Sequence, residues 1–282
     1  MKKKVLIIVN VGKDESKLLA KEISSYLEER EYTVDLFNFD GFCKNKNFKG
    51  YDFVVTLGGD GTVLYAARNC VDNDIPIFPI NLGQFGFMAP IQPKLWKEYM
   101  DAYLSGKDVY FQERSLLKSM LIRDGKVLNE NLSLNDIVIN AKESSATVFL
   151  FVHYDNLLLC RLKSDGVIIC SPTGSTAYSS SAGGPIVDPT MDAFVMTPLN
   201  SFSLSSRPIV LNAEGTLEIH LQPCRAKAVN LIVDGQTPIS LQTGDIIRIV
   251  KNPKKIKLLF CDEEKFYNSL RSKLNWRGEP YA

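Results

Sequence analysis

The chain has 282 residues, of which 45% are hydrophobic and 23% charged, and its formal net charge is +1. This balance is typical of a soluble globular protein, and the small net charge argues against nucleic acid or an anionic membrane as a partner. The apolar run at residues 5–9 is too short for a signal peptide, and no run approaches the roughly 20 apolar residues of a membrane span. Six cysteines occur singly and histidine occurs twice, so we expect no zinc site and a cytoplasmic protein with reduced cysteines.

The first hundred residues alternate between strand and helix patterns. Short apolar runs indicate buried strands, and apolar residues at helical spacing, such as Leu19, Ile23 and Leu27, indicate helices between them. We predict strands at residues 5–9, 33–39, 53–57 and 75–80, and helices at 14–30, from just after Gly61 toward Cys70, and at 93–104. Strands that alternate with helices form a parallel sheet covered on both faces.

From about residue 108 the pattern changes to many short strands separated by turn residues. We predict strands at 116–123, 134–140, 147–154, 157–163, 166–170, 208–211, 216–222, 228–234, 245–251 and 256–260, a hairpin at Asp124-Gly125, and a helical tail at 263–276. The sequence therefore predicts an α/β protein: a Rossmann-like N-terminal α/β domain (1–107) is followed by a β-rich C-terminal domain (108–261). We expect the C-terminal helix (262–282) to pack back on the first domain.

A glycine-rich turn with one acidic residue follows the apolar run at 53–57. Gly58, Gly59 and Gly61 surround Asp60, and Thr62 follows. At the carboxyl end of a parallel strand, glycines let backbone amides approach a phosphate, and the start of a helix adds a favourable partial charge. A carboxylate repels a phosphorylated ligand, so Asp60 fits a base or a metal ligand for phosphoryl transfer to a hydroxyl. The alternative is a plain strand–turn–helix connection.

The turn matches neither of the two common nucleotide-binding patterns. It lacks the GxxxxGK[ST] of P-loop kinases and the GxGxxG of ordinary dehydrogenases. Gly-Gly-Asp-Gly-Thr resembles the signature shared by NAD kinases, by diacylglycerol and sphingosine lipid kinases, and by phosphofructokinases. The turn alone does not distinguish these families.

A second block of residues does distinguish them. After Asp165, the apolar run at 166–170 leads into Ser-Pro-Thr-Gly-Ser-Thr-Ala-Tyr at 171–178 and Ser-Ser-Ser-Ala-Gly-Gly-Pro at 179–185. Backbone amides, hydroxyl donors and one aromatic ring suit a ribose, a pyrophosphate and an adenine ring, whereas the alternative is a long polar surface loop. This block closely resembles the DG…TPTGSTAYxxSAGGP segment of the NAD kinase family.

Further segments resemble the same family. Residues 81–87 are similar to its NxGxLGFL turn and end at Phe87, and residues 134–138 are similar to its LNE(V/I)V strand, whose Asn-Glu pair holds NAD. Asp136 stands here in place of the usual glutamate, and its shorter side chain reaches less far. Residues 197–208 follow TPxCPHSLSxRP, with Asn-Ser-Phe at 200–202 in place of Cys-Pro-His. Residues 234–236 match the family's DGQ, although Asp-Gly alone would indicate only a turn.

The resemblance implies an NAD kinase with a substrate site between its two domains. Asp60 would be the catalytic base, and ATP with Mg²⁺, or inorganic polyphosphate, would phosphorylate NAD to NADP. The family forms dimers or tetramers, so we expect a homodimer or homotetramer whose partners are otherwise small molecules. The binding residues that the resemblance implies are Gly58, Gly59, Gly61, Thr62, Phe87, Asn135, Asp136, Lys163, Asp165, Thr176, Ala177, Tyr178, Ser179, Ser180, Ser181, Asn200 and Gln236.

Two other functions stay open at this point. A lipid kinase would use the same glycine-rich turn, but it would need an apolar or basic surface that faces a membrane and would not need the serine-rich loop. A non-catalytic sensor of pyridine nucleotides would keep the fold. The presence of Asp60 argues against the sensor, because loss of activity usually begins with loss of the base.

Overall fold

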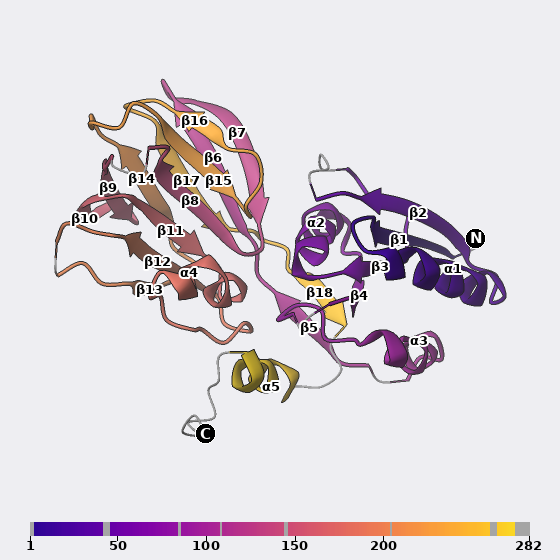
Figure 1. Ribbon diagram of the computed structural model, residues 1–282. Helices are drawn as coiled ribbons and strands as arrows, with labels where there is room; N and C mark the ends of the chain where they lie inside the picture. The colour runs from indigo at the N-terminus through magenta and orange to yellow at the C-terminus, as the bar shows by residue number, and fades with distance from the viewer. Residues whose placement is uncertain are drawn as a thin grey trace. The chain divides into compact units, whose positions relative to one another are not determined.

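The computed structural model of the protein describes residues 3–41, 46–83, 86–107, 109–143, 146–203, 205–259 and 264–273 (Figure 1). The chain divides into two compact units, which are Met1–Glu113 with Ile256–Ala282, and Arg114–Lys255. The fold is mixed α/β, with helices concentrated in the first unit and strands in the second. No helix in the described part of the chain is long and apolar enough to cross a membrane.

The first unit is built on a six-stranded sheet with helices around it (Figure 1). The strand order is β2-β1-β3-β4-β18-β5, and β1, β2, β3, β4 and β18 pair in parallel. The strands are β1 (Lys4–Asn10), β2 (Thr33–Phe39), β3 (Phe53–Gly58), β4 (Ile77–Asn81), β5 (Phe111–Arg114) and β18 (Ile256–Leu259). The helices are α1 (Asp14–Glu28), α2 (Asp60–Cys70), α3 (Trp96–Leu104) and α5 (Glu264–Lys273), with short 3₁₀ turns η1 (Val71–Asn73) and η2 (Pro93–Leu95).

The side chains of β1 alternate between the two faces of this sheet and are apolar on both, which explains why helices cover both faces. Val5, Ile7 and Val9 belong to one apolar cluster with residues of α1 and α3. On the opposite face, Tyr65 of α2 stacks on Phe39 of β2, with ring centroids 4.8 Å apart. From β1 the chain passes to β2 on one side and later to β3 on the other, so the strand order reverses between β1 and β3. In open α/β sheets, ligands bind outside the carboxyl ends of the strands at such a switch point.

The second unit is a sandwich of two six-stranded sheets. Their orders are β10-β9-β14-β17-β6-β7 and β13-β12-β11-β8-β15-β16, and residues of both sheets share one apolar core. The strands are β6 (Leu117–Arg123), β7 (Lys126–Ser133), β8 (Asp136–Ala141), β9 (Val148–Tyr154), β10 (Leu157–Ser164), β11 (Gly166–Cys170), β12 (Ala193–Leu199), β13 (Ile209–Asn212), β14 (Leu217–Leu221), β15 (Val229–Val233), β16 (Ile239–Leu241) and β17 (Ile246–Lys251). After β11 the chain forms a 3₁₀ turn, η3 (Thr173–Thr176), and a short helix, α4 (Tyr178–Ser181).

Most predicted elements are present, and the differences have local causes. The hairpin at Asp124-Gly125 is confirmed, because both residues have positive φ (50° and 73°) and β6 pairs antiparallel with β7. The polar strand β7 was not predicted, because it is an edge strand whose first half is largely exposed and carries little apolar pattern. The strands β5, β12 and β16 were also not predicted. Helix α2 begins at Asp60 rather than after Gly61, and β18 lies in the first sheet.

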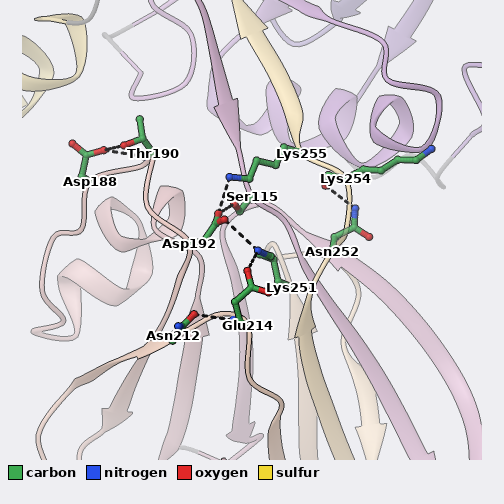
Figure 2. A network of polar contacts seen from close by, with 10 residues as sticks. All are labelled: Ser115, Asp188, Thr190, Asp192, Asn212, Glu214, Lys251, Asn252, Lys254 and Lys255. Carbon is green, nitrogen blue, oxygen red and sulfur yellow. Dashed lines mark hydrogen bonds and ion pairs between the residues drawn. The ribbon is translucent and has the colours of Figure 1, made fainter.

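A network of ion pairs centred on Asp192 joins the two ends of the second unit (Figure 2). Its carboxylate accepts a hydrogen bond from Ser115, near the start of the unit, and pairs with Lys251 (3.2 Å) and Lys255 (3.0 Å) near its end. Partial burial alone would raise the pKa of Asp192, but the hydrogen bonds from Ser115, Lys255 and Lys251 outweigh this effect and lower it to about 2. The network therefore stabilises the folded state while Asp192 is ionised.

Replacing the charge at this position tests the network. Since the pKa of Asp192 is lower in the folded than in the unfolded chain, its contribution is present above about pH 4 and lost as pH falls toward 2. Asp192→Asn should lower the free energy of unfolding by roughly 1–2 kcal/mol at pH 7 in urea titrations. Glu130→Gln removes the more exposed ion pair with Lys118 and should change it by less than about 0.5 kcal/mol. Equal effects of the two variants at pH 7 would contradict this account.

Candidate active site

The glycine-rich turn lies at the carboxyl end of β3, beside the switch point of the first sheet. β3 is fully buried and ends at Gly58, and Gly59 caps the start of α2. A Cβ atom on Gly59 or Gly61 would meet no atom within 4 Å, so a ligand can approach the backbone here. The side chain of Thr62 is buried, and its hydroxyl has no hydrogen-bond partner among the described residues. These are features of a phosphate-binding helix N-terminus.

Backbone amides hold the carboxylate of Asp60 in place. Phe87 N–H donates to Oδ2 at 3.0 Å and Met88 N–H donates to Oδ1 at 3.2 Å. Gly86 packs directly under this carboxylate, and a Cβ atom there would collide with it. A carboxylate offers about four acceptor positions, so two hydrogen bonds orient Asp60 and leave positions for a substrate hydroxyl. Phe87, predicted as a binding residue, contributes its amide to Asp60, and its ring packs against Phe266 of α5 (6.2 Å between centroids).

The loop after β1 adds a cation that the sequence analysis did not select. Lys13 Nζ donates a hydrogen bond to the carbonyl of Leu82, and Leu82 N–H donates to the carbonyl of Gly58 at 2.8 Å. Lys13 therefore lies at the same edge of the sheet as the glycine-rich turn. The residues next to Lys13 in the sequence form no recognised motif. Lys13 lies close to the glycine-rich turn only because β1 pairs with β3.

In the second unit, the residues that precede β8 form a buried turn. Asn135 Oδ1 is buried and accepts no hydrogen bond from the described residues, which leaves an acceptor for a ligand donor. Asp136 is 7% exposed. Burial first, and the nearby charge of Asp234 second, raise the pKa of Asp136 from 3.8 to about 7. The aspartate that replaces the expected glutamate is thus a carboxyl group that can carry a proton at neutral pH.

The serine-rich loop packs against this turn. Ser171 N–H donates to the carbonyl of Asn135 at 2.9 Å, and a Cβ atom on Gly174 would collide with the backbone of Asn135. The structure therefore brings the loop and the Asn135-Asp136 pair together. Tyr178 is 49% exposed. Thr176, Ala177 and Ser180 are half-buried and Ser181 is exposed, which leaves them open to a ligand to different degrees.

Ser179 differs from its neighbours in the loop. Its side chain is fully buried, and its hydroxyl hydrogen-bonds to that of Thr197 on β12 at 2.8 Å. The nearby thiol of Cys170 on β11 has its pKa raised to about 12 by burial. This geometry gives Ser179 a role in holding α4 to the sheet.

The remaining predicted residues fall into two groups. Asn200 Nδ2 donates to Asp165 Oδ2 at 2.9 Å, and the ammonium group of Lys163 lies 4.9 Å from the ring centre of Phe202. Lys163 and Phe202 line an open cavity of about 550 Å³. Asn200 and Phe202, which differ from the family pattern, thus contact Asp165 and Lys163 respectively. Gln236 lies in the turn after β15, and its side chain donates back to the carbonyl of Asp234 at 3.3 Å.

The glycine-rich turn with its oriented carboxylate in the first unit, and the hydroxyl-rich loop beside an asparagine in the second, are each features of phosphotransferases that act on nucleotides. The model of the ATP-NAD kinase N-terminal domain matches residues 38–108, and the model of the ATP-NAD kinase C-terminal domain matches residues 134–260. The chain belongs to the NAD kinase family. It is an enzyme with NAD kinase function, so the lipid-kinase and sensor alternatives are set aside.

Individual relatives agree over nearly the whole chain. The NAD kinase of Treponema denticola is 41% identical over 98% of this chain and 97% of its own length, and that of Treponema pallidum is 38% identical over 99% and 92%. Yeast NADH kinase complexed with NADH superposes with a TM-score of 0.88 at 25% identity, over 99% of this chain and 89% of that one. An NAD kinase from Archaeoglobus fulgidus in complex with ATP, 24% identical, shares the fold with a TM-score of 0.75 over 98% of this chain and 100% of that one.

The raised pKa of Asp136 predicts an unusual dependence of stability on pH. Between about pH 4 and 7 the folded chain holds a proton on Asp136 that the unfolded chain has released, so the free energy of unfolding falls as pH rises through this range. Asp136→Asn cannot ionise. The free energy of unfolding of the variant, measured in urea and compared with that of the wild type, should therefore rise by roughly 2–3 kcal/mol between pH 5 and pH 8. Parallel pH profiles of the two proteins would show that Asp136 titrates normally.

Proposed function

We propose that the chain transfers the γ-phosphoryl group of ATP to the 2′-hydroxyl of the adenosine ribose of NAD, which gives NADP, and that Asp60 is the general base. The observation that carries the proposal is the Asp60 carboxylate, oriented by two backbone amides at the start of α2 beside open glycine backbone. As the 2′-oxygen attacks the γ-phosphorus, its proton passes to Asp60 and the bond from the γ-phosphorus to the bridging oxygen of ADP breaks.

The donor phosphates have a fitting set of partners in the first unit. The amides near Gly59 and Gly61 and the positive end of α2 favour phosphate oxygens. We propose that Lys13 contributes a positive charge to the same group, since its ammonium lies at this edge of the sheet. The buried Thr62 hydroxyl, which lacks a partner among the described residues, supplies a further hydrogen-bond donor.

A divalent cation fits this site only as a companion of the nucleotide. Among the described residues, no group of three or more His, Cys, Asp or Glu side chains could hold a metal ion. Mg²⁺ in phosphoryl-transfer enzymes is held by one or two carboxylates together with substrate phosphates and water, and Asp60 would be the carboxylate here. The ion would offset the negative charge that develops on the transferred group.

The second unit supplies the groups for NAD. We propose that Asn135 and Asp136 hydrogen-bond to its hydroxyl and amide groups and that the adenosine part lies against the loop from Thr176 to Ser181. The exposed ring of Tyr178 offers a stacking surface. We propose that Asn200 and Asp165, which pair with one another, and Lys163, which lies beside Phe202, contact the same substrate. Gln236 would join them if its side chain turned away from Asp234.

Several broader features belong to the proposal as well. The yeast relative was solved with NADH, so we propose NADH as a further acceptor alongside NAD. We also propose polyphosphate as a further donor alongside ATP. A homodimer or homotetramer follows from the resemblance to the family. The described cysteines, Cys70, Cys160, Cys170 and Cys224, are free, which supports a reducing, cytoplasmic location.

Removing the proposed base tests the reaction. The purified protein should form NADP from NAD, ATP and Mg²⁺, measured with an NADP-specific dehydrogenase, and Asp60→Asn should lower kcat by about 10²–10⁴-fold while the protein stays folded. Asp74→Asn removes an exposed carboxylate of the same unit, paired with Lys257, and should leave kcat unchanged. Near-full turnover by Asp60→Asn would exclude Asp60 as the base, and no NADP from the wild type would exclude the reaction.

The proposed role of Lys13 predicts a defect confined to the donor. Lys13→Gln should raise KM for ATP about tenfold, because a charge-assisted contact with phosphate is lost, and should leave KM for NAD within about twofold. Lys13→Arg should recover part of the affinity. Lys17→Gln, in the exposed first turns of α1, is the matched control and should behave as the wild type. A rise in KM for NAD equal to that for ATP would contradict the assignment.

A further inference from the structure

The carboxylate of Asp234 gathers the whole turn that precedes β8. Its Oδ1 accepts hydrogen bonds from Ser133 Oγ (2.6 Å), Asn135 N–H (2.9 Å) and Asp136 N–H (3.2 Å), and its Oδ2 accepts one from Leu134 N–H (3.1 Å). Asp234 is 7% exposed and lies about 100 residues further along the chain. Four donors from four consecutive residues thus converge on one buried side chain.

Only a carboxylate side chain can accept all four of these hydrogen bonds. An ionised carboxyl group accepts at about four positions and donates at none, whereas an amide side chain offers one accepting oxygen and two N–H donors. Without Asp234, three consecutive backbone N–H groups would lose their partner in a buried position, where unpaired donors are rarely tolerated. The backbone at Asp234 is left-handed (φ 45°) and Gly235 follows with φ 65°, so the same residue also makes the turn between β15 and β16.

The turn that Asp234 holds carries the two residues proposed to bind NAD. The amide oxygen of the Asn135 side chain is buried without a partner among the described residues, and the backbone carbonyl of Asn135 accepts a hydrogen bond from the Ser171 amide of the serine-rich loop. The backbone of Asn135 also forms the surface against which Gly174 packs. Any shift of this turn would therefore move Asn135 and Asp136 and release the loop that lies on them.

We propose that Asp234 is a positioning residue for NAD, which it serves by fixing the Asn135-Asp136 turn without touching the substrate. This inference rests on the proposed function of these two residues. It differs from the resemblance to the DGQ segment, which implicates Gln236 as the contact residue. The role also explains why an aspartate is needed here beyond the turn, since asparagine or glycine would satisfy the left-handed backbone equally well.

Asp234 also carries a negative charge close to Asp136. Its removal should therefore change the pH dependence of NAD binding, which the loss of a purely structural contact would not do. Among the described residues, the titratable groups that face Asp136 are Asp234, directly after β15, and the Cys170 thiol, directly across on β11. Burial first and the Asp234 charge second raise the pKa of Asp136 to about 7. Removing that charge should therefore lower the pKa of Asp136 and move any pH-dependent step in NAD binding to lower pH.

The test is NAD binding by Asp234→Asn, measured by calorimetry without ATP from pH 5 to pH 9. We expect the dissociation constant for NAD to rise about tenfold at pH 7, the pH midpoint to move to lower pH, and KM for ATP to stay within about twofold. Asp124→Asn is a matched control, because Asp124 occupies the same kind of left-handed Asp-Gly turn (φ 50°) in an exposed hairpin. It should leave NAD binding unchanged.

Wild-type affinity and an unmoved midpoint in Asp234→Asn would overturn the proposal, and so would an equal loss of affinity in Asp124→Asn. If Asp234→Asn does not fold, Ser133→Ala removes one of the four donors and keeps the charge. It should weaken NAD binding by a smaller factor with the midpoint unmoved, and wild-type affinity in that variant would then overturn the proposal. Because binding is measured without turnover, a protein that binds NAD but forms no NADP contradicts the proposed reaction, while the effect of Asp234→Asn still decides the role of Asp234.

Discussion

The two hydrogen bonds that fix the Asp60 carboxylate are the interaction on which the catalytic half of the site depends. An acid at the positive end of α2 would be free to turn toward the helix amides, which is the usual fate of an acid in the first turn of a helix. Here Phe87 N–H and Met88 N–H occupy one acceptor position on each oxygen, and Gly86 leaves just enough room for the group. Asp60 is thereby kept away from the amides that phosphates need, and its remaining acceptor positions stay available.

The second unit follows the same physical rule with other residues. A carboxylate that accepts backbone amides, Asp234, holds a turn, and a glycine at a close contact, Gly174, brings a second segment onto it. In both units most of the orienting hydrogen bonds come from backbone N–H groups, with the Ser133 hydroxyl as a further donor in the second unit, so the geometry depends mainly on the path of the chain. Side chains such as Asn135 and Tyr178 then remain for the ligand. This division separates residues that shape the site from those that contact substrate.

The sequence predicted the parts of the site that are local along the chain. The glycine-rich turn and the serine-rich loop are continuous segments, and each strand before them is a buried and mostly apolar run. The contacts between distant segments could not be read in this way. Nothing adjacent to Asp234 indicates that it accepts amides from residues 134–136, and nothing adjacent to Lys13 indicates that it reaches Leu82. Strand β7 was missed for a related reason, since an exposed edge strand carries little apolar pattern.

The most direct test of Asp60 as the base is a crystal structure with NAD and a non-hydrolysable ATP analogue bound together. A general base must lie within hydrogen-bonding reach of the proton that it removes. An Asp60 carboxylate oxygen should lie about 2.6–3.2 Å from the 2′-oxygen of the adenosine ribose, with the Phe87 and Met88 amides still bound to the carboxylate. A 2′-oxygen that instead contacts another acid or a bound water, with Asp60 turned toward the metal ion alone, would contradict it.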